Sequence, residues 1–362
     1  MKKRKLSEQV KTKIARLVDH KFAEEIFTEH LPKYYPDFKK LSGVTCTPFK
    51  RHLGVTSAVF VVEFKIKYID KEGKNRHLDI FASAHSDGSR KGAYQKTKAL
   101  YTHGFDKGKF RVTKPLFFLA QQKAFFYEAS PGSSLFYFFT ENPRADLKPS
   151  FELAAGWVKK VHQLDFPTTV EWPVFKISNM IPSPEDFIED FYNDDKKQGK
   201  IIKKLVADMV RMKKSFDKRI DKNIIYGDYH PENVIIKDLK AKDLEMIDFT
   251  DLAMGDSMMD LGTFLQQFDF MGHNFLSREK MNKYKRYFVE SYFGQKFDDI
   301  AVDFINRINL YQSWTAMRTA VFLFYMKNVE NPVDDLLHDA VKHLELAKAS
   351  KKHINLYYHL PR

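Results

Sequence analysis

The residues best suited to chemistry lie between Tyr226 and Phe249. Asp228 is followed five residues later by Asn233, and Asp248 comes after a further short apolar stretch. A carboxylate such as Asp228 can orient the hydroxyl that attacks a phosphorus atom and accept its proton. Asn233 and Asp248 offer the hard oxygen ligands that Mg²⁺ prefers. This order and spacing favour phosphoryl transfer from a nucleotide.

The longer pattern around these residues resembles a known enzyme family. Asp228 lies in Gly227-Asp228-Tyr229-His230-Pro231-Glu232-Asn233, which is followed by Ile247-Asp248-Phe249, Gly255-Asp256 and Asp260-Leu261. The string is similar to the aminoglycoside phosphotransferase and choline kinase group, which phosphorylates hydroxyls of small molecules. The match is specific over residues 223–265 and looser over 44–265, and beyond 265 only the helical content agrees. The resemblance implies an α+β, two-lobed protein-kinase-like fold with a small β-rich N-lobe and a larger, mainly helical C-lobe.

The resemblance also implies ATP and Mg²⁺ as cofactors and a role for each matching residue. Asp228 would be the catalytic base, and Asn233 and Asp248 would be the Mg²⁺ ligands. Asp260 would be structural and would accept backbone N–H groups of the catalytic loop. His230 lies between the base and the first metal ligand. It could contact phosphate or hydrogen-bond the loop, and we favour the loop.

Nucleotide-binding residues are implied in the N-lobe as well. The backbone of Glu128 and Ala129, with Ser130, would form the hinge that meets the nucleotide base. The turn after Leu53 would cover the phosphates with four residues: Gly54, Val55, Thr56 and Ser57. An ordinary hairpin turn explains the single glycine equally well.

The third strand departs from the family pattern. It normally carries a lysine that pairs with the phosphates, held by a glutamate of the next helix. Here Ser83 stands at the lysine position and Gln95 and Lys96 stand where the glutamate is expected. A serine cannot supply a cation. Three other side chains could take over the charge: Lys65, Lys67 and His85.

The departure leaves other interpretations open. The alignment at Ser83 could be off by a few residues, or the protein could be a nucleotide-binding pseudokinase. A nucleotidyl transferase that holds the nucleotide in an inverted orientation is a further alternative. The presence of Asp228, Asn233 and Asp248 together argues against a scaffold, which has no need of all three.

The elements that must position these residues fall into two parts. Apolar residues at helical spacing predict a helix over Ser7–Leu31, which ends before Pro32. Five β-rich stretches, with a helix at Gly92–His103 after the third, follow at Val44–Lys50, Ala58–Tyr68, Arg76–Ala84, Lys114–Gln121 and Lys123–Ala129. We expect residues 1–128 to form this helix plus a β-rich nucleotide-binding lobe.

Residues 129–362 are expected to form a helical catalytic and substrate-binding lobe. The predicted helices are Phe151–Leu164, Pro184–Asn193, Ile201–Ile220, Met258–Phe270, Arg278–Phe293, Ile300–Asn328 and Val333–Ala349. Three short apolar strands interrupt them at Asn223–Tyr226, Asn233–Lys237 and Leu244–Ile247. These strands would hold the loops that carry Asp228 and Asp248 rigidly.

Composition limits the partners. The chain has 362 residues, with 60 Lys and Arg against 47 Asp and Glu, for a formal charge of +13. This excess favours anionic partners, so polyanion contact through basic segments such as 196–222 is an alternative role. The single cysteine, Cys46, excludes a disulfide framework and a cysteine-based zinc site. No apolar run reaches the ~20 residues of a membrane helix. We expect a cytoplasmic protein with no membrane insertion and no obligate protein partner. The expected acceptor is a hydroxyl group of a small molecule, which the sequence does not identify.

Overall fold

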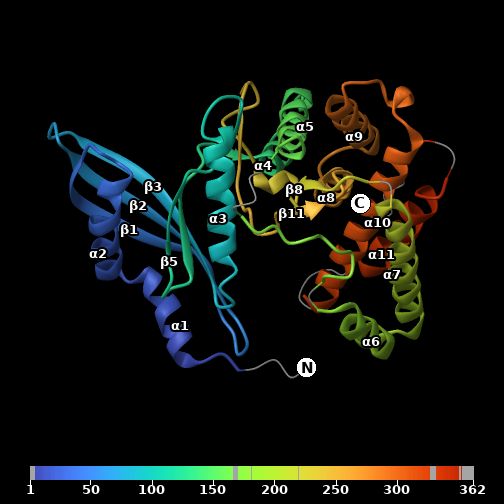
Figure 1. Cartoon of the computed structure of the whole chain (residues 1–362), viewed down its shortest axis with the longest axis horizontal. Helices are drawn as coiled ribbons and strands as arrows, with labels where there is room; N and C mark the ends of the chain where they lie inside the picture. The colour runs from blue at the N-terminus through green and yellow to red at the C-terminus, as the bar shows by residue number, and fades with distance from the viewer. Residues whose placement is uncertain are drawn as a thin grey trace. The chain divides into compact units, whose positions relative to one another are not determined.

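The computed structural model describes residues 5–165, 170–180, 182–218, 220–326, 332–349 and 352. The chain divides into two compact units. The first runs to Pro131 and also takes in Glu245–Thr250, and the second holds Gly132–Leu244 and the residues from Asp251 onward. The segment that carries Asp248 therefore groups with the first unit, although it follows the loop of Asp228 in the chain. The first unit is rich in strands and the second is mostly helical, as predicted (Figure 1).

An antiparallel five-stranded sheet forms the centre of the first unit. Its strands, in spatial order, are β1 (Phe38–Leu53), β2 (Ala58–Asp70), β3 (Asn75–His85), β6 (Ala124–Glu128) and β5 (Pro115–Leu119). All five predicted strands are present, and β1 extends beyond Val44–Lys50 in both directions because β2 pairs with it from Phe38 to Leu53. A short strand that the sequence did not indicate, β4 (Phe110–Val112), precedes β5.

The predicted N-terminal helix is two helices. They are α1 (Glu8–Ala15) and α2 (His20–His30), with a tighter helical turn at Arg16–Val18 between them. Asp19 has an extended backbone, and its side chain accepts a hydrogen bond from Phe22 N at 2.7 Å. An aspartate in this position caps a new helix, so the chain changes direction there although the apolar spacing continues.

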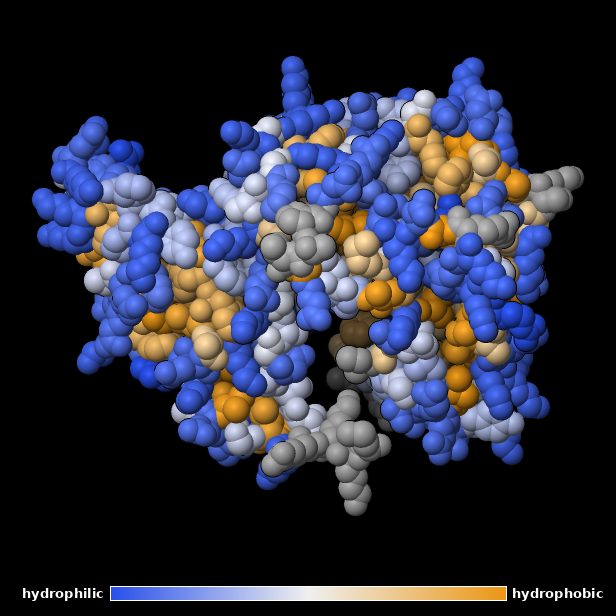
Figure 2. Space-filling model, viewed as in Figure 1, coloured by the Kyte–Doolittle hydropathy of each residue, from blue (hydrophilic) through white to orange (hydrophobic). Residues whose placement is uncertain are grey.

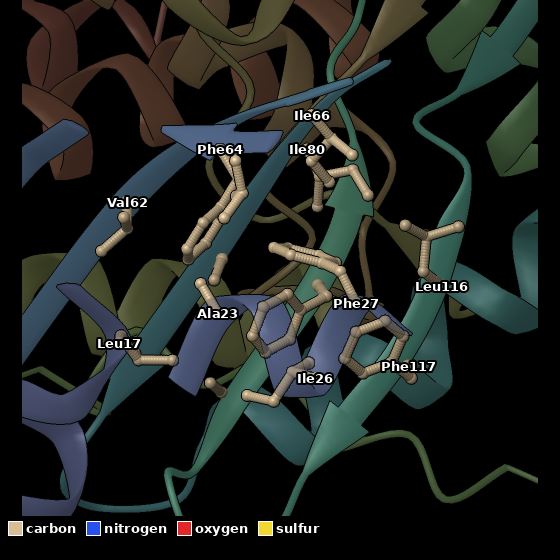
Figure 3. Packing of buried hydrophobic residues seen from close by; sticks show 14 of the residues in the cluster. Leu17, Ala23, Ile26, Phe27, Val62, Phe64, Ile66, Ile80, Leu116 and Phe117 are labelled. Carbon is tan, nitrogen blue, oxygen red and sulfur yellow. The ribbon is translucent and has the colours of Figure 1, made fainter. Parts of the chain in front are cut away.

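The core of the first unit lies between α2 and one face of the sheet. Phe27 of α2 meets Phe64 of β2 and Phe126 of β6, with ring centroids 5.0 Å and 6.0 Å apart. Figure 3 shows Phe27 and Ile26 directed toward these strands. On β3, Ile80, Ala82 and Ala84 belong to the same core. Successive strand residues point to opposite faces, so Phe81 and Ser83 face the other side of the sheet, where α3 (Arg90–Leu100) packs on β5 and β6.

The second unit is built from eight helices within the described residues. They are α4 (Leu135–Glu141), α5 (Lys148–His162), α6 (Pro184–Asp194), α7 (Lys196–Asp217), α8 (Met258–Gly272), α9 (Arg278–Phe293), α10 (Val302–Tyr325) and α11 (Val333–Leu346). Helix α10 packs against α8 and α11, and α5 packs against α9. The predicted end of α10 at Asn328 lies outside the described residues. None of the helices in the described ranges is long and apolar enough to cross a membrane.

Short strands border the loops that concern function. In the second unit they are β7 (Ser133–Ser134), β8 (Asn223–Ile225), β9 (Val234–Ile236) and β11 (Ala253–Gly255). A further short strand, β10 (Leu244–Met246), runs into Glu245–Thr250, the segment that groups with the first unit. Strand β8 pairs with β11 and β7 pairs with β9. The three short strands predicted from the sequence are thus confirmed as β8, β9 and β10.

Candidate active site

The loop with Asp228 begins with a sharp turn after β8. Gly227 has a φ of +89°, in the left-handed region that favours glycine. A Cβ atom there would also lie 2.2 Å from the backbone oxygen of Asp251. The turn therefore requires glycine twice over, for its backbone angle and for the close approach of a neighbouring chain segment.

Asp260 holds this turn in place. Its two carboxylate oxygens accept the backbone N–H groups of Tyr226 at 2.6 Å and Gly227 at 2.8 Å. His162 Nε2 lies 2.9 Å from the same carboxylate, and its Nδ1 lies 2.9 Å from the hydroxyl of Tyr292. Asp260 is fully buried. A buried carboxylate with all these partners fixes the backbone immediately before Asp228.

Asp228 itself is paired with positive charge. Arg318 of α10 donates from Nη2 to Oδ1 of Asp228, and His230 Nε2 lies 3.5 Å from Oδ2. Burial raises the pKa of Asp228, but Arg318 and His230 outweigh burial and hold this pKa well below its usual range. The carboxylate is therefore ionised at neutral pH. In that state it can orient a hydroxyl and receive its proton as the bond to phosphorus forms.

Asn233 has the orientation that a cation ligand needs. It ends a short helical turn, Pro231–Asn233. Its Nδ2 donates to the backbone oxygen of Asp228 at 3.2 Å and lies 3.0 Å from Nε2 of His230. With the amide nitrogen engaged in this way, the amide oxygen is the atom that would meet a divalent cation. The donor type fits Mg²⁺.

Asp248 occupies an unusual backbone conformation in the first unit. Its φ of 57° is rare for a residue with a side chain. Its Oδ1 accepts hydrogen bonds from Thr250, 3.3 Å from the backbone nitrogen and 2.5 Å from Oγ1, and Arg90 Nη1 lies 3.8 Å away. A strained residue held by its neighbours is typical of functional sites. The carboxylate has the chemistry of the predicted Mg²⁺ ligand.

The turn after Leu53 is a tight hairpin between β1 and β2. Gly54 N donates to the backbone oxygen of Ser57 at 2.8 Å, and Val55 is 65% exposed at the tip. Thr56 is exposed as well. This geometry suits both the hairpin-turn and the phosphate-loop interpretations of Gly54.

The hinge segment is bonded within the first unit. Glu128 N donates to the backbone oxygen of Lys114 at 3.0 Å, and Ala129 N donates to that of Asp79 at 2.8 Å. The backbone oxygen of Glu128 accepts a hydrogen bond from Thr113 Oγ1 at 2.6 Å. The two N–H groups of the predicted hinge are therefore already engaged, so a base would meet carbonyl oxygens there or would have to displace these bonds.

Ser83 stands opposite Val61 on β2 and Phe125 on β6. It therefore shares its sheet face with Phe125, whose ring lies 5.5 Å from Tyr94 of α3. Ser83 thus lies on the side of the sheet where α3 packs, and its interpretation as the family's lysine position stays a prediction.

Two arginines beside the acidic residues were not predicted as site residues. Arg318 lies next to Trp314, with its guanidinium carbon 5.0 Å from the ring centroid, and it reaches Asp228 from 90 positions away. Arg90 lies 3.8 Å from Asp248 Oδ1 and comes from 158 positions away. The sequence offers no local signal for either pair, because neither partner lies near the other in the chain.

The chain is similar to a known protein family over part of its length. Residues 143–293 match the model of the phosphotransferase enzyme family. No curated protein matches the chain significantly.

Solved structures match over nearly the whole chain. Ethanolamine kinase from Plasmodium vivax matches with a TM-score of 0.53 and 13% identity, covering 95% of this chain and 94% of the kinase. Amicoumacin kinase hAmiN, solved with AMP-PNP, Ca²⁺ and Ami, matches with a TM-score of 0.55 and 13% identity, covering 92% and 95%. The gentamicin complex of APH(2″)-IIa matches with a TM-score of 0.53 and 14% identity, covering 89% and 95%.

At these identities the solved structures show the fold alone, and the predicted protein-kinase-like fold is confirmed. The family match adds the sequence pattern, since residues 143–293 include Asp228, Asn233, Asp248 and Asp260. The resemblance to the aminoglycoside phosphotransferase and choline kinase group is thus confirmed, and this chain carries the pattern of the phosphotransferase enzyme family over residues 143–293.

Proposed function

We propose that this protein is a small-molecule kinase that transfers a phosphoryl group from ATP, with Mg²⁺, to a hydroxyl group. The observation that carries the proposal is the loop of Asp228. An ionised carboxylate stands on a backbone turn that Asp260 fixes through two hydrogen bonds. This loop lies inside the segment that matches the phosphotransferase family.

Each residue has a distinct task in this proposal. Asp228 orients the acceptor hydroxyl for in-line attack and receives its proton. Asn233 and Asp248 would hold Mg²⁺, which offsets the charge that develops on the phosphate oxygens. His230 holds Asn233 and Asp228 in register through its contacts with both.

The first unit supplies the nucleotide-binding residues in this proposal. The backbone of Glu128 and Ala129 meets the base, and the hairpin of Gly54, Val55, Thr56 and Ser57 covers the phosphates. Ser83 lies at the level of the phosphates and contributes no charge. We propose a cytoplasmic enzyme that needs no obligate protein partner.

The test compares wild type with Asp228→Asn in a mixed pool of small hydroxyl compounds. Mg²⁺-dependent ATP turnover is measured, and the products are analysed by mass. We expect a product heavier by roughly 80 Da, one phosphoryl group, and a loss of ~10²-fold or more in turnover in the variant. ATP affinity should be retained, because Asp228 acts on the acceptor. Asp299→Asn, the same change at an exposed position, should leave turnover unchanged.

Other outcomes would replace the proposal. A product that carries a nucleotidyl group would identify a nucleotidyl transferase. Mg²⁺-dependent ATP binding without turnover of any compound in a broad pool would favour the pseudokinase interpretation, which the serine at position 83 motivates. A wild-type protein that binds no ATP would refute the enzymatic proposal.

A further inference from the structure

Ser83 leaves an electrostatic gap in the nucleotide site proposed above. The phosphates of ATP carry several negative charges, and kinases of this fold oppose them with a side-chain cation as well as the metal. A serine cannot do this. A different cation of the first unit must therefore act near the Asp248 loop if ATP binds there.

The candidates that the sequence offered are poorly placed. Lys65 lies opposite Asp79, four residues along β2 from the Val61 that pairs with Ser83. At about 3.3 Å per residue this separates Lys65 from Ser83 by ~13 Å along the sheet. The Lys65 side chain is 64% exposed. Lys67 lies two residues further along β2, opposite His77.

His85 is also committed elsewhere. Its Nδ1 lies 2.7 Å from the carboxylate of Asp87, in the turn that leads to α3. An imidazole paired with a carboxylate has little net charge to offer a phosphate.

Helix α3 instead brings two cations to the loop of Asp248. Arg90, in the first turn of α3, contacts Thr250 Oγ1 through Nη1 and lies 3.8 Å from Asp248 Oδ1. Lys96 donates from Nζ to the backbone oxygen of Thr250 at 3.1 Å. Both side chains are largely buried, with Arg90 15% exposed and Lys96 8% exposed for the whole residue.

The guanidinium of Arg90 keeps capacity for a further anion. Its Nε is buried and has no hydrogen-bond partner in the described part of the chain. The 3.8 Å to Asp248 is well beyond the ~2.8 Å of a charge-assisted hydrogen bond. A guanidinium presents five donors in a planar fork, the geometry that binds phosphate oxygens in pairs.

Arg90 also acts on the sheet face that carries Ser83. Burial raises the pKa of Tyr127, the Asp248 carboxylate raises it further, and Arg90 opposes the increase. Tyr127 lies 6.0 Å from Phe81 between ring centroids, on the face shared with Ser83. The charge of Arg90 therefore reaches the surface from which the strand lysine is missing.

We propose that Arg90, at the start of α3, supplies the cation that binds the nucleotide phosphates in place of a lysine on β3. Lys96 holds the Asp248 loop against the helix through Thr250. This inference rests on the proposed function and adds the origin of the phosphate-binding charge. The helix that provides a carboxylate partner in the family thus provides positive charge in this chain.

The test measures nucleotide affinity by calorimetry on the full chain with Mg²⁺, using ATP, ADP, AMP and adenosine. Arg90→Gln should weaken ATP and ADP binding by ~10-fold to 100-fold and leave adenosine binding within about 2-fold, because only the phosphates lose a partner. Lys91→Gln, an exposed neighbour on the same helix, should change neither affinity.

A second variant separates the loss of the charge from misfolding of the protein. Arg90→Lys keeps the charge and loses the fork, so it should fall between wild type and Arg90→Gln for ATP. Circular dichroism checks that each variant folds. Equal ATP affinity in wild type, Arg90→Gln and Arg90→Lys would overturn the assignment while leaving ATP binding intact. Failure of wild type to bind any nucleotide would overturn the proposed function and this inference together.

Discussion

Gly227 is the residue whose backbone most strictly sets the position of Asp228. Replacement by alanine should cost stability in two ways, through the left-handed φ of +89° and through the 2.2 Å approach of its Cβ to Asp251 O. Gly294 is a matched control, because its φ is +68° and a Cβ there meets nothing within 4 Å. We expect Gly294→Ala to cost about 1 kcal/mol. Gly227→Ala should cost roughly 2 kcal/mol more, because overpacking adds to the backbone strain.

Chemical denaturation of both variants measures the difference. A loss of stability at Gly227 no larger than that at Gly294 would show that the Asp251 segment yields easily, and that the loop is not held as tightly as the contacts indicate. Turnover gives a second readout, since only the change at position 227 should also displace Asp228.

Which site residues could be predicted depended on how local their signal is. The spacing of Asp228, Asn233 and Asp248 along the chain is a local pattern, so it can be recognised from the sequence alone. Arg318 and Arg90 reach these carboxylates from α10 and α3, and only tertiary packing joins them. The missing charge at Ser83 was visible in the sequence, but the approach of Arg90 to the Asp248 loop was not, because the predicted helix began at Gly92.

Helices and strands were predicted well where the spacing of apolar residues and the length of the segment indicated the same kind of element. The sheet strands and the short strands β8, β9 and β10 follow from apolar runs bounded by turn residues. The prediction of a single helix over Ser7–Leu31 was wrong. The apolar spacing continues through Asp19, but the side chain of Asp19 caps a second helix there. Periodicity alone does not report a cap inside a continuous amphipathic pattern.

Helix α11 carries a buried carboxyl group that should make stability depend on pH. Burial, with the nearby carboxylates of Asp269 and Asp335, raises the pKa of Asp339 to about 7. The lysines that oppose this are Lys285 and Lys342. Asp339 Oδ1 is buried and has no hydrogen-bond partner among the described residues. The folded protein therefore favours the neutral form of this group.

The raised pKa sets the sign of the effect. The contribution of Asp339 to stability is fully present below pH 4 and is lost as the pH rises toward 7, since the unfolded chain ionises first. Asp339→Asn should remove this dependence and stabilise the protein at pH 8 by at most about 4 kcal/mol. Thermal unfolding at pH 5 and pH 8 measures it, with the exposed Asp299→Asn as control. An unchanged or lower melting temperature for Asp339→Asn at pH 8 would show that this carboxyl group is ionised without cost.

At the scale of the whole molecule, the chain carries an excess of positive charge. The formal charge is +13. Hydrophilic residues cover much of the face shown in Figure 2. The fold and the family pattern account for the ordered loop of Asp228, but neither accounts for this charge. Residues 196–222 form one of the basic segments that the sequence offers for polyanion contact.

The structure shows that part of this segment is neutralised on its own helix. On α7, Lys204 lies 2.7 Å and Arg211 3.7 Å from the carboxylate of Asp208. Lys213 pairs with Asp217, and its side chain is largely buried. These pairs follow helical spacing, which is the pattern of a solvated charged face. Two carboxylates offset only part of the charge of α7, and we expect the rest to attract polyanions without forming a specific site.

Salt dependence distinguishes a spread charge from a site. Binding of a single-stranded RNA of about 20 nucleotides, followed by fluorescence anisotropy, should be weak, with a log–log salt slope shallower than about −2. The double variant Lys203→Gln/Lys214→Gln on α7 and the double variant Lys39→Gln/Lys40→Gln on β1 each remove two exposed charges. Both should change the affinity equally, because non-specific attraction responds to net charge and not to position. A slope of about −4 or steeper that only the α7 variant reduces would instead place a polyanion site on that helix.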